Sequence, residues 1–194
     1  MKKSILAIFT VLLSFFMGIT VTACNKAKTE NGEIKTTATK SEWDSALTLK
    51  NVTAKGFATE NGKQETVLFK IADTVYYSEN DGYISWGIEK NGEYYVYTND
   101  SQEWQKVNGV KISVGTILMS FHLPEFESFN YDEATKSYVC ENPDYPDAYY
   151  KYNVYFENGY IVKFESRAQT GVIQYSFEFT NYGKTVVEMP NEDI

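Results

Sequence analysis

The side chains that most often carry out chemistry are scarce in this chain. It has a single histidine, His122, two cysteines and one arginine. A single histidine excludes a histidine-rich zinc site and leaves a serine triad only one base. His122 lies beside Leu123-Pro124 at the end of an expected helix, where packing or capping explains it better than catalysis. We therefore expect no metal site, no cofactor and no enzymatic activity.

The remaining reactive groups also favour structural roles. Cys140 ends the strand-like run 137–140, and its charged neighbours are acidic. Burial and acidic neighbours raise the pKa of a thiol, so we expect a free, buried and unreactive cysteine. Arg167 could bind an anion, but an exposed ion pair is the better interpretation. The 26 acidic residues could include an acid and base pair, yet solvation explains them in an acidic surface protein.

Aromatic side chains are the informative excess. The chain has 16 Tyr, 12 Phe and 3 Trp. Many fall at positions expected to face inward, where a tyrosine hydroxyl needs a hydrogen-bond partner. Two explanations stay open. One is ordinary core packing, and the other is an apolar pocket with tyrosine hydroxyls at its mouth, as in a lipid or small-ligand cavity.

The elements that must position these side chains begin after an export signal. Lys2 and Lys3 precede an apolar run from Ile5 to Ile19, and small or short residues lead to Cys24. This is the layout of a secretory signal, and the run is shorter than the roughly 20 apolar residues of a spanning helix. We predict a signal peptide over residues 1–23 that is cleaved.

The end of this signal, Val21-Thr22-Ala23-Cys24, resembles the bacterial lipoprotein signal, in which a small residue precedes a cysteine that is diacylated and becomes the new first residue. The resemblance implies that Cys24 carries the lipid and cannot pair with Cys140. Two acyl chains give stable anchoring. We therefore expect an extracytoplasmic lipoprotein, with palmitate or a similar chain holding it to the cell membrane.

A polar tether and one domain follow the signal. Residues 24–40 are too polar to bury a core, so we expect a flexible tether. Residues 41–194 have the size of a single domain, which we expect to be monomeric. The chain has 18 basic against 26 acidic side chains and a pI near 4.8. This excess of acidic side chains excludes a protein that binds the phosphate backbone of nucleic acids.

Hydrophobic periodicity predicts strands after one short helix. Ser41 is the expected N-cap, with Glu42 and Asp44 in the first helical turn. Beyond this helix, apolar residues alternate with other residues, which gives each strand one apolar face. The alternation is clearest over 67–71, 150–156, 160–164 and 173–179. Asn-Gly or Asp-Gly pairs favour two-residue hairpins at 61–62, 81–82, 91–92 and 158–159. We predict an antiparallel meander.

One segment has helical spacing instead. Val114, Ile117, Leu118 and Phe121 recur at i, i+3, i+4 and i+7, and a proline follows. We predict a helix over 112–122 that covers the apolar face of a single sheet, which gives an α+β fold. A two-sheet sandwich with a peripheral helix is the alternative. Residues 125–148 are expected to form long loops around one short strand at 137–141.

The order of elements and the end of the chain resemble small bacterial lipoproteins of the LolA and LppX/LprG type. The matching features are a helix at Glu42-Trp43 leading into a strand at 51–53, a mid-chain helix, a strand over 175–180, a turn at 182–184, and a valine-rich strand ending at Pro190. In that superfamily a curved antiparallel sheet wraps as a half-barrel around helices, and the hollow holds lipid. The resemblance implies the same fold here and no catalytic residues. The acidic loop at 125–148 and the single clear internal helix depart from the pattern.

These observations predict a non-enzymatic surface protein that binds an apolar ligand, a lipid or acyl chains, between sheet and helix. The expected ligand contacts are Phe69, Ile71, Leu118, Phe121, Tyr152, Val154, Val162, Phe164, Tyr175 and Phe177. The alternative is an interaction module that binds a protein or a glycan through the acidic, aromatic loop 141–150. The direction of the aromatic side chains distinguishes the two. Aromatic residues at positions that face inward favour the cavity. An outer binding surface would be favoured by aromatic residues in loops or at outward positions, namely Tyr145, Tyr149 and Trp104.

Overall fold

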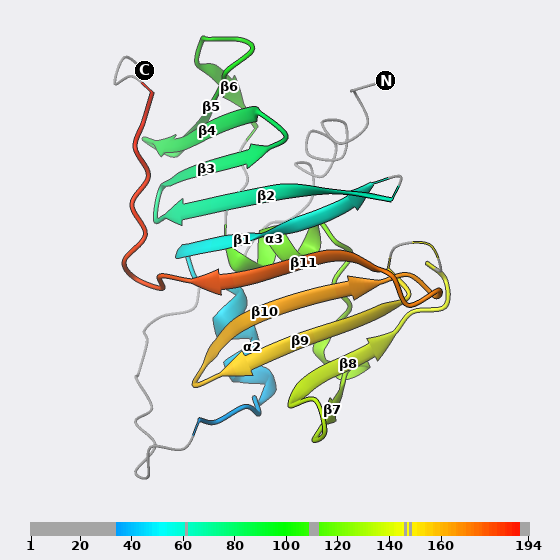
Figure 1. Ribbon diagram of the computed structural model, residues 1–194. Coiled ribbons are helices and arrows are strands. Elements are labelled where there is room, and N and C mark those ends of the chain that lie inside the picture. Colours follow the sequence, from blue (N-terminus) through cyan, green and yellow to red (C-terminus); the bar gives the residue numbers. More distant parts are fainter. Residues whose placement is uncertain (1–33, 61, 109–112, 146, 148, 191–194) are drawn as a thin grey trace.

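The described part of the chain folds as one large antiparallel sheet with two short α-helices on one face (Figure 1). This computed structural model describes residues 34–60, 62–108, 113–145, 147 and 149–190. The predicted signal peptide, Cys24 and most of the expected tether lie outside the described residues. The α+β class and the single sheet are confirmed, and the eleven strands do not divide into the two layers of a sandwich.

Two antiparallel meanders make up the sheet. The first contains β1 (Asn51–Glu60), β2 (Lys63–Ala72), β3 (Val75–Asn80), β4 (Tyr83–Lys90), β5 (Glu93–Thr98) and β6 (Gln105–Val107). The second contains β7 (Asn130–Asp132), β8 (Ser137–Glu141), β9 (Lys151–Glu157), β10 (Tyr160–Arg167) and β11 (Ile173–Thr180). β1 pairs with β11, so the order is β6-β5-β4-β3-β2-β1-β11-β10-β9-β8-β7. The first and last strands of the described fold therefore meet in the middle of the sheet.

The predicted two-residue hairpins are present wherever the structure describes them. Asp81-Gly82 joins β3 to β4, Asn91-Gly92 joins β4 to β5, and Asn158-Gly159 joins β9 to β10. Both residues of each pair have positive φ, for example 46° at Asp81 and 79° at Gly82. Asparagine, aspartate and glycine tolerate this left-handed conformation, so the turn chemistry dictates these hairpins.

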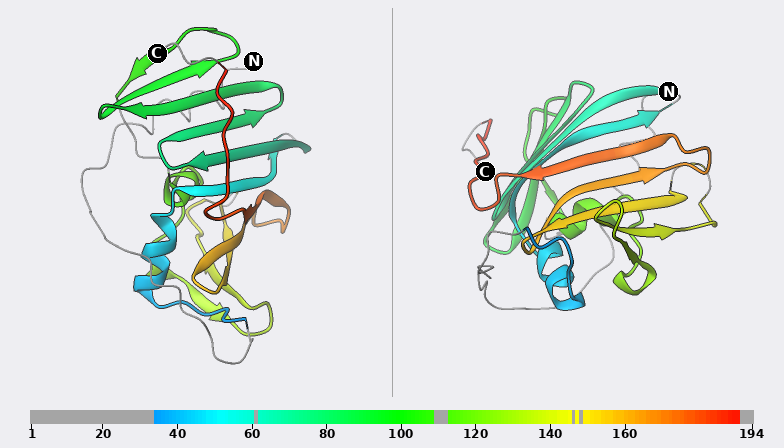
Figure 2. Two further views of the ribbon diagram at one scale, coloured as in Figure 1. Left: turned by 90° about the vertical axis from the view of Figure 1, so that its left-hand side faces the viewer. Right: turned by 60° about the horizontal axis from the view of Figure 1, so that its bottom comes forward.

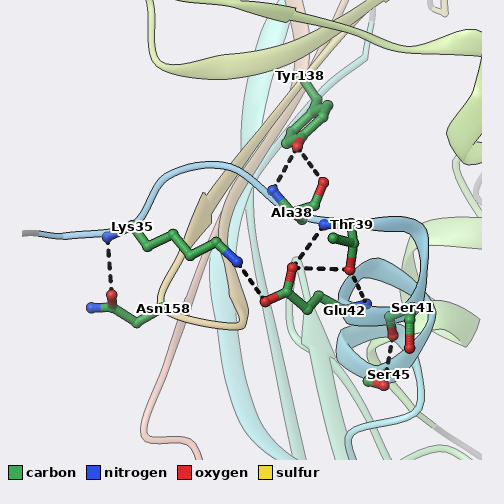
Figure 3. A network of polar contacts seen from close by, with 8 residues as sticks. All are labelled: Lys35, Ala38, Thr39, Ser41, Glu42, Ser45, Tyr138 and Asn158. Carbon is green, nitrogen blue, oxygen red and sulfur yellow. Dashed lines mark hydrogen bonds and ion pairs between the residues drawn. The ribbon is translucent and has the colours of Figure 1, made fainter. Parts of the chain in front are cut away.

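The first described helix, α2 (Lys40–Leu47), begins earlier than predicted. Thr39 is its N-cap, not Ser41, and a capping box joins the Thr39 side chain to the Glu42 backbone and the Glu42 side chain to the Thr39 backbone (Figure 3). Trp43 and Ala46 face the sheet and are buried. A threonine two residues upstream has the same capping chemistry as the serine, which explains the shift.

The residues just before α2 are docked on the domain instead of belonging to the tether. Lys35 donates its backbone N–H to Asn158 Oδ1, and Tyr138 bonds both the N–H and the carbonyl of Ala38 (Figure 3). Thr36 Oγ1 is hydrogen-bonded to Tyr131 Oη. Residues 35–38 thus contact the folded domain, although the predicted boundary of the domain lies at residue 41.

The second helix, α3 (Val114–Met119), is shorter than the predicted 112–122. Ser113 caps it, and Val114, Ile117 and Leu118 are buried against the sheet as their spacing predicts. A Cβ on Gly115 would lie 2.9 Å from the carbonyl oxygen of Leu47, so glycine allows the two helices to meet. Both helices lie beneath the same face of the sheet (Figure 2, right).

Three further differences from the predicted pattern concern strands. A bulge in β10 between Ile161 and Lys163 shifts the alternation, so Ile161 and Phe164 are both buried while Val162 is only half-buried. The predicted valine-rich strand before Pro190 is an extended segment outside the sheet. The 125–148 region contains β7 and a 3-10 helix, Phe126–Ser128, as well as the predicted strand.

The helices cover only part of the sheet. β1, β2 and β8–β11 contribute most of the buried core, together with Trp43 and α3. In contrast, every residue of β3 and β5 is at least partly exposed, and β4 buries only Ser85 and Gly87. Strands β3–β6 therefore form a single layer whose two faces both meet solvent, projecting beyond the core (Figure 1).

Candidate functional site

The ten expected ligand contacts mostly form the core of the protein. Phe69, Ile71, Leu118, Tyr152, Val154, Phe164 and Phe177 are 8 % exposed or less. Phe121 and Tyr175 pack against them as half-buried residues. Val162 is the exception, because the bulge in β10 shifts the alternation of side chains so that Val162 no longer faces the core. Nine of the ten side chains therefore belong to the core or pack against it, Leu118 and Phe121 from the region of α3 and the others from the sheet.

The rings of these residues fill the space between sheet and helix. The Phe121 ring centroid lies 4.8 Å from that of Tyr175, 5.0 Å from that of Phe177 and 5.8 Å from that of Phe164. These are the separations of rings in direct contact. Tyr152 donates its hydroxyl to the backbone oxygen of His122, 3.0 Å away, so its polar group is satisfied. The aromatic excess at these positions serves core packing.

The loop at 141–150 folds its tyrosines against this core. Tyr149 stacks on Tyr175 at 5.5 Å with nearly parallel rings, and burial, then its contact with Tyr175, strongly raises the pKa of its hydroxyl. Tyr145 stacks on His122 at 5.4 Å and is 47 % exposed. The described aromatic side chains of this loop thus close the edge of the core, and the loop presents no continuous aromatic surface.

The other reactive groups have structural surroundings. Cys140 is a buried free thiol, and burial and Glu141 raise its pKa, as predicted. The guanidinium of Arg167 lies 2.8 Å from Glu165, which also binds Lys163, so the predicted ion pair is present, but its carboxylate is buried and not exposed as expected. Among the described residues, no three His, Cys, Asp or Glu side chains are placed to hold a metal ion. None of these groups forms a recognisable reaction centre.

An aromatic surface lies elsewhere, on the outer face of the single-layer strands, opposite the helices. Register places Lys70 of β2 beside Tyr77 of β3, Tyr77 beside Trp86 of β4, and Trp86 beside Tyr97 of β5. Trp104, just before β6, continues the line, with its ring 5.5 Å from that of Tyr97. We name Lys70, Tyr77, Trp86, Tyr97 and Trp104 the aromatic row. All five are half-buried.

The row is held together by contacts between neighbouring strands. The Trp86 ring is 5.5 Å from Tyr77 and 5.7 Å from Tyr97, and the Lys70 ammonium lies 5.5 Å from the Tyr77 ring centroid. Cross-strand aromatic pairs of this kind stabilise a sheet that has no second layer. The Tyr77 hydroxyl donates to Glu79, and burial together with that carboxylate raises the Tyr77 pKa to about 12. The hydroxyl is therefore neutral at physiological pH.

The rings of the row are tilted and do not form a flat platform. Successive rings meet at interplanar angles of 68°, 72° and 54°. Tilted packing of this kind turns ring edges as well as ring faces to the surface. Such a surface suits a ligand with side chains and a polar backbone better than one that requires parallel ring faces.

The C-terminal segment lies across part of this face. It leaves β11 through a turn and runs over the strands (Figure 2, left). Thr185 Oγ1 is 3.0 Å from Thr53 Oγ1 on β1, and the Trp86 indole N–H donates to the backbone oxygen of Glu188 at 2.9 Å. Thr53, Lys70, Tyr77 and Trp86 are successive partners in register, so the segment follows the row.

Sequence reasoning named only Trp104 of the four rings in the row. The alternation in 75–98 contains the others, since Tyr77, Trp86 and Tyr97 are paired through hairpins whose Asp-Gly and Asn-Gly turns are evident. Counting outward from each turn places all three on one face. The sequence could therefore have indicated the row, but not which face the helices leave uncovered.

No protein-family model matches the chain, and no curated protein matches it either.

Within the described part of the chain, no helix has the length and apolar character needed to cross a bilayer.

Proposed function

We propose that this protein is a non-enzymatic binding module of the cell surface, and that it binds a protein partner through the aromatic row. The observation that carries this proposal is a line of half-buried aromatic rings on a sheet layer that no helix or strand of the described domain covers, and that the C-terminal segment crosses only in part. Contiguous apolar surface of this kind marks interaction sites in soluble proteins, and Trp and Tyr dominate binding energy at interfaces.

Ring geometry favours a polypeptide over a glycan. The tilts of 54–72° between successive rings prevent several sugar faces from stacking in a row. The Trp86 indole instead donates to a backbone carbonyl, that of Glu188. A peptide backbone presents such acceptors at regular intervals. The interaction surface expected on the loop 141–150 is therefore assigned to the row instead, and of the two expected ligand classes, protein and glycan, we retain protein.

The location of the module follows from the N-terminal sequence. We propose that signal cleavage and diacylation at Cys24 anchor the protein to the outer face of the cell membrane, with a tether shorter than residues 24–40 because residues 35–38 bind the domain. Two acyl chains keep such a protein at the membrane. A binding face on the β3–β6 layer would then be available to extracellular proteins.

The test is a selection of peptides by the intact mature protein. A phage library of random ten-residue peptides is panned on the wild-type protein, and enriched peptides are measured against Tyr97→Ala and Trp104→Ala. The matched control is Tyr160→Ala, which removes a half-buried surface tyrosine on β10 away from the row. We expect peptides whose affinity falls about tenfold or more with the row variants and stays unchanged with the control.

Two results would contradict the proposal. One is enrichment of peptides that bind the control and row variants equally well. The other is the absence of row-dependent peptides together with row-dependent binding of soluble β-glucan or chitin oligosaccharides, which would assign the row to glycans.

The apolar-ligand prediction remains a second candidate. The sheet curving over α2 and α3 supports the half-barrel interpretation, and the half-buried rings of Phe121, Tyr149 and Tyr175, which close the edge of the core, would have to move apart for acyl chains to enter. Native mass spectrometry of the protein purified from cells tests it. One co-purified lipid per chain supports this candidate, whereas a ligand-free mass with no uptake of added phospholipid contradicts it.

A further inference from the structure

The C-terminal segment is directed onto the row by a defined turn. After β11, Asn181 and Gly183 adopt positive φ of 57° and 71°, and the Gly183 N–H donates to the Asn51 carbonyl at 3.0 Å. The Asn51 side chain then accepts the N–H of Thr185 at 2.8 Å. Thr185 is 7 % exposed, so the segment is fixed where it crosses β1.

Beyond Thr185 the segment presents alternate residues to the sheet. Val187 and Met189 are half-buried, whereas Val186 is 73 % exposed and Glu188 is exposed. This is the period of an extended chain, in which successive side chains point to opposite sides. The backbone carbonyl of Glu188 accepts the Trp86 indole N–H. The segment thus shows how an extended polypeptide occupies this face.

Only the first part of the row lies along this path. The contacts at Thr53 and Trp86 bracket Lys70 and Tyr77, and the rings of Tyr97 and Trp104 continue the line in the same direction. A longer extended chain laid on the same path would contact every ring of the row. The aromatic row therefore extends beyond the C-terminal segment's contact with Trp86, to Tyr97 and Trp104.

We infer that the row binds an extended polypeptide that crosses the strands, with apolar side chains at alternate positions facing the rings and a carbonyl on the Trp86 indole. The segment Thr185–Met189 is its resident occupant, and a partner segment takes its place. This inference rests on the proposed function. A tethered occupant competes at high effective concentration, so an external peptide binds more weakly while the resident segment is seated.

The experiment releases the segment within the full-length mature protein. Val187→Asp with Met189→Asp places charges against the rings, and Val186→Asp adds a charge at the exposed neighbour as the matched control. The probe is a dye-labelled peptide with the sequence of residues 184–194, measured by fluorescence anisotropy. Circular dichroism shows whether each variant is folded, and Met189→Ala serves as a milder release.

We expect the peptide to bind the released protein at least about tenfold more tightly than the wild type or the Val186→Asp protein. Binding to the released protein should be lost with Trp86→Ala. A peptide carrying the two aspartates should not bind. In spectra of 15N-tryptophan protein, the Trp86 indole signal should shift on release and return when peptide is added.

Equal peptide affinity for all proteins, or binding that survives Trp86→Ala, would overturn the inference. If library peptides bind the wild-type row without displacing the segment, the proposed function stands and this inference fails. If the 184–194 peptide binds the released protein but no library peptide uses the row, the resident segment is confirmed and the proposed function fails.

Discussion

Glu165 is the acidic residue whose surroundings differ most from solvent. Its side chain is 6 % exposed, lies 2.8 Å from both Lys163 and Arg167, and points away from the helices. Burial raises the pKa of Glu165, but the hydrogen bonds from Lys163 and Arg167 outweigh it and hold the pKa below its usual 4.5. The folded state therefore favours the ionised carboxylate.

Replacement of Glu165 by Gln should destabilise the protein by about 1–3 kcal/mol near neutral pH, because two cations lose their shared acceptor charge. A carboxylate with a lowered pKa contributes stability above its unfolded pKa and loses it as the pH falls through its folded pKa. The difference between wild type and variant should thus shrink below about pH 4.5. Urea unfolding at several pH values measures it, and a difference that stays constant down to about pH 3 would contradict the expectation.

The cap of α2 gives a second prediction at this scale. Thr39→Ala removes the N-cap hydroxyl that accepts the Glu42 N–H, and should lower the free energy of unfolding by about 1 kcal/mol. Ser41→Ala replaces the serine that the sequence pattern predicts as the cap. This variant should change the free energy of unfolding by less than about 0.5 kcal/mol. Urea midpoints of the two variants compare them directly. A larger effect at Ser41 would contradict the observed cap.

Among the elements, the pairing of β1 with β11 depends on Gly56. A Cβ at this position would lie 1.7 Å from the carbonyl oxygen of Ser176, an atom of the backbone. Gly56→Ala must therefore move one of the two central strands, and we expect a loss of more than about 3 kcal/mol or failure to fold. Thermal unfolding monitored by circular dichroism measures the loss.

Gly87→Ala is the matched comparison on β4. Its added Cβ would lie 1.7 Å from the Tyr76 ring, a side chain in the outlying layer that can shift more readily than a backbone carbonyl. We expect a loss of about 1 kcal/mol, well below that of Gly56→Ala. The reverse order of the two losses would mean that the β1–β11 seam is not the centre of the fold.

Much of the element pattern was accessible from the sequence. Turn pairs such as Asp81-Gly82 and the alternation at 67–71 predict the hairpins and their buried faces, because both depend on local chemistry. The bulge at Val162 was not accessible, since it is fixed by how β9 and β11 pair with β10. The final segment also has strand-like residues, but its hydrogen bonds to Asn51 and Trp86 take it across the face of the sheet.

At the scale of the whole molecule, the sheet has a supported and an unsupported half. Strands β9–β11, β1 and β2 share the helices and the buried core, whereas β3–β6 have their neighbours in the sheet and the C-terminal segment, which reaches Trp86. Hydrogen-exchange mass spectrometry should find amide protection highest in β1 and β9–β11 and lower in β4–β6, because local opening is easiest where few apolar contacts are lost. Uniform protection across the sheet would contradict this division.

Membrane attachment is the second prediction at this scale. Cys24→Ala removes the residue that the lipoprotein signal would acylate, so the protein should leave the membrane fraction. Fractionation of cells that express wild type or variant, followed by immunoblotting, measures this. Ala23→Ser keeps a small residue before Cys24 and is the control. A variant that stays with the membrane would place the anchor elsewhere.

The docking of residues 35–38 has a mechanical consequence. The chain enters the domain beside the β9–β10 turn and β7–β8, at the opposite end of the sheet from β6 (Figure 1). A pull between the N-terminal side and a partner held on the row is therefore directed across the strands. Such a force acts on the hydrogen bonds between one pair of neighbouring strands after another. In the order of the sheet, the strands that it crosses are β5, β4, β3, β2, β1, β11 and β10. If the protein is anchored and binds a partner as proposed, tension would separate the strands of the thin half of the sheet first, and this would limit the force that a bound partner can exert.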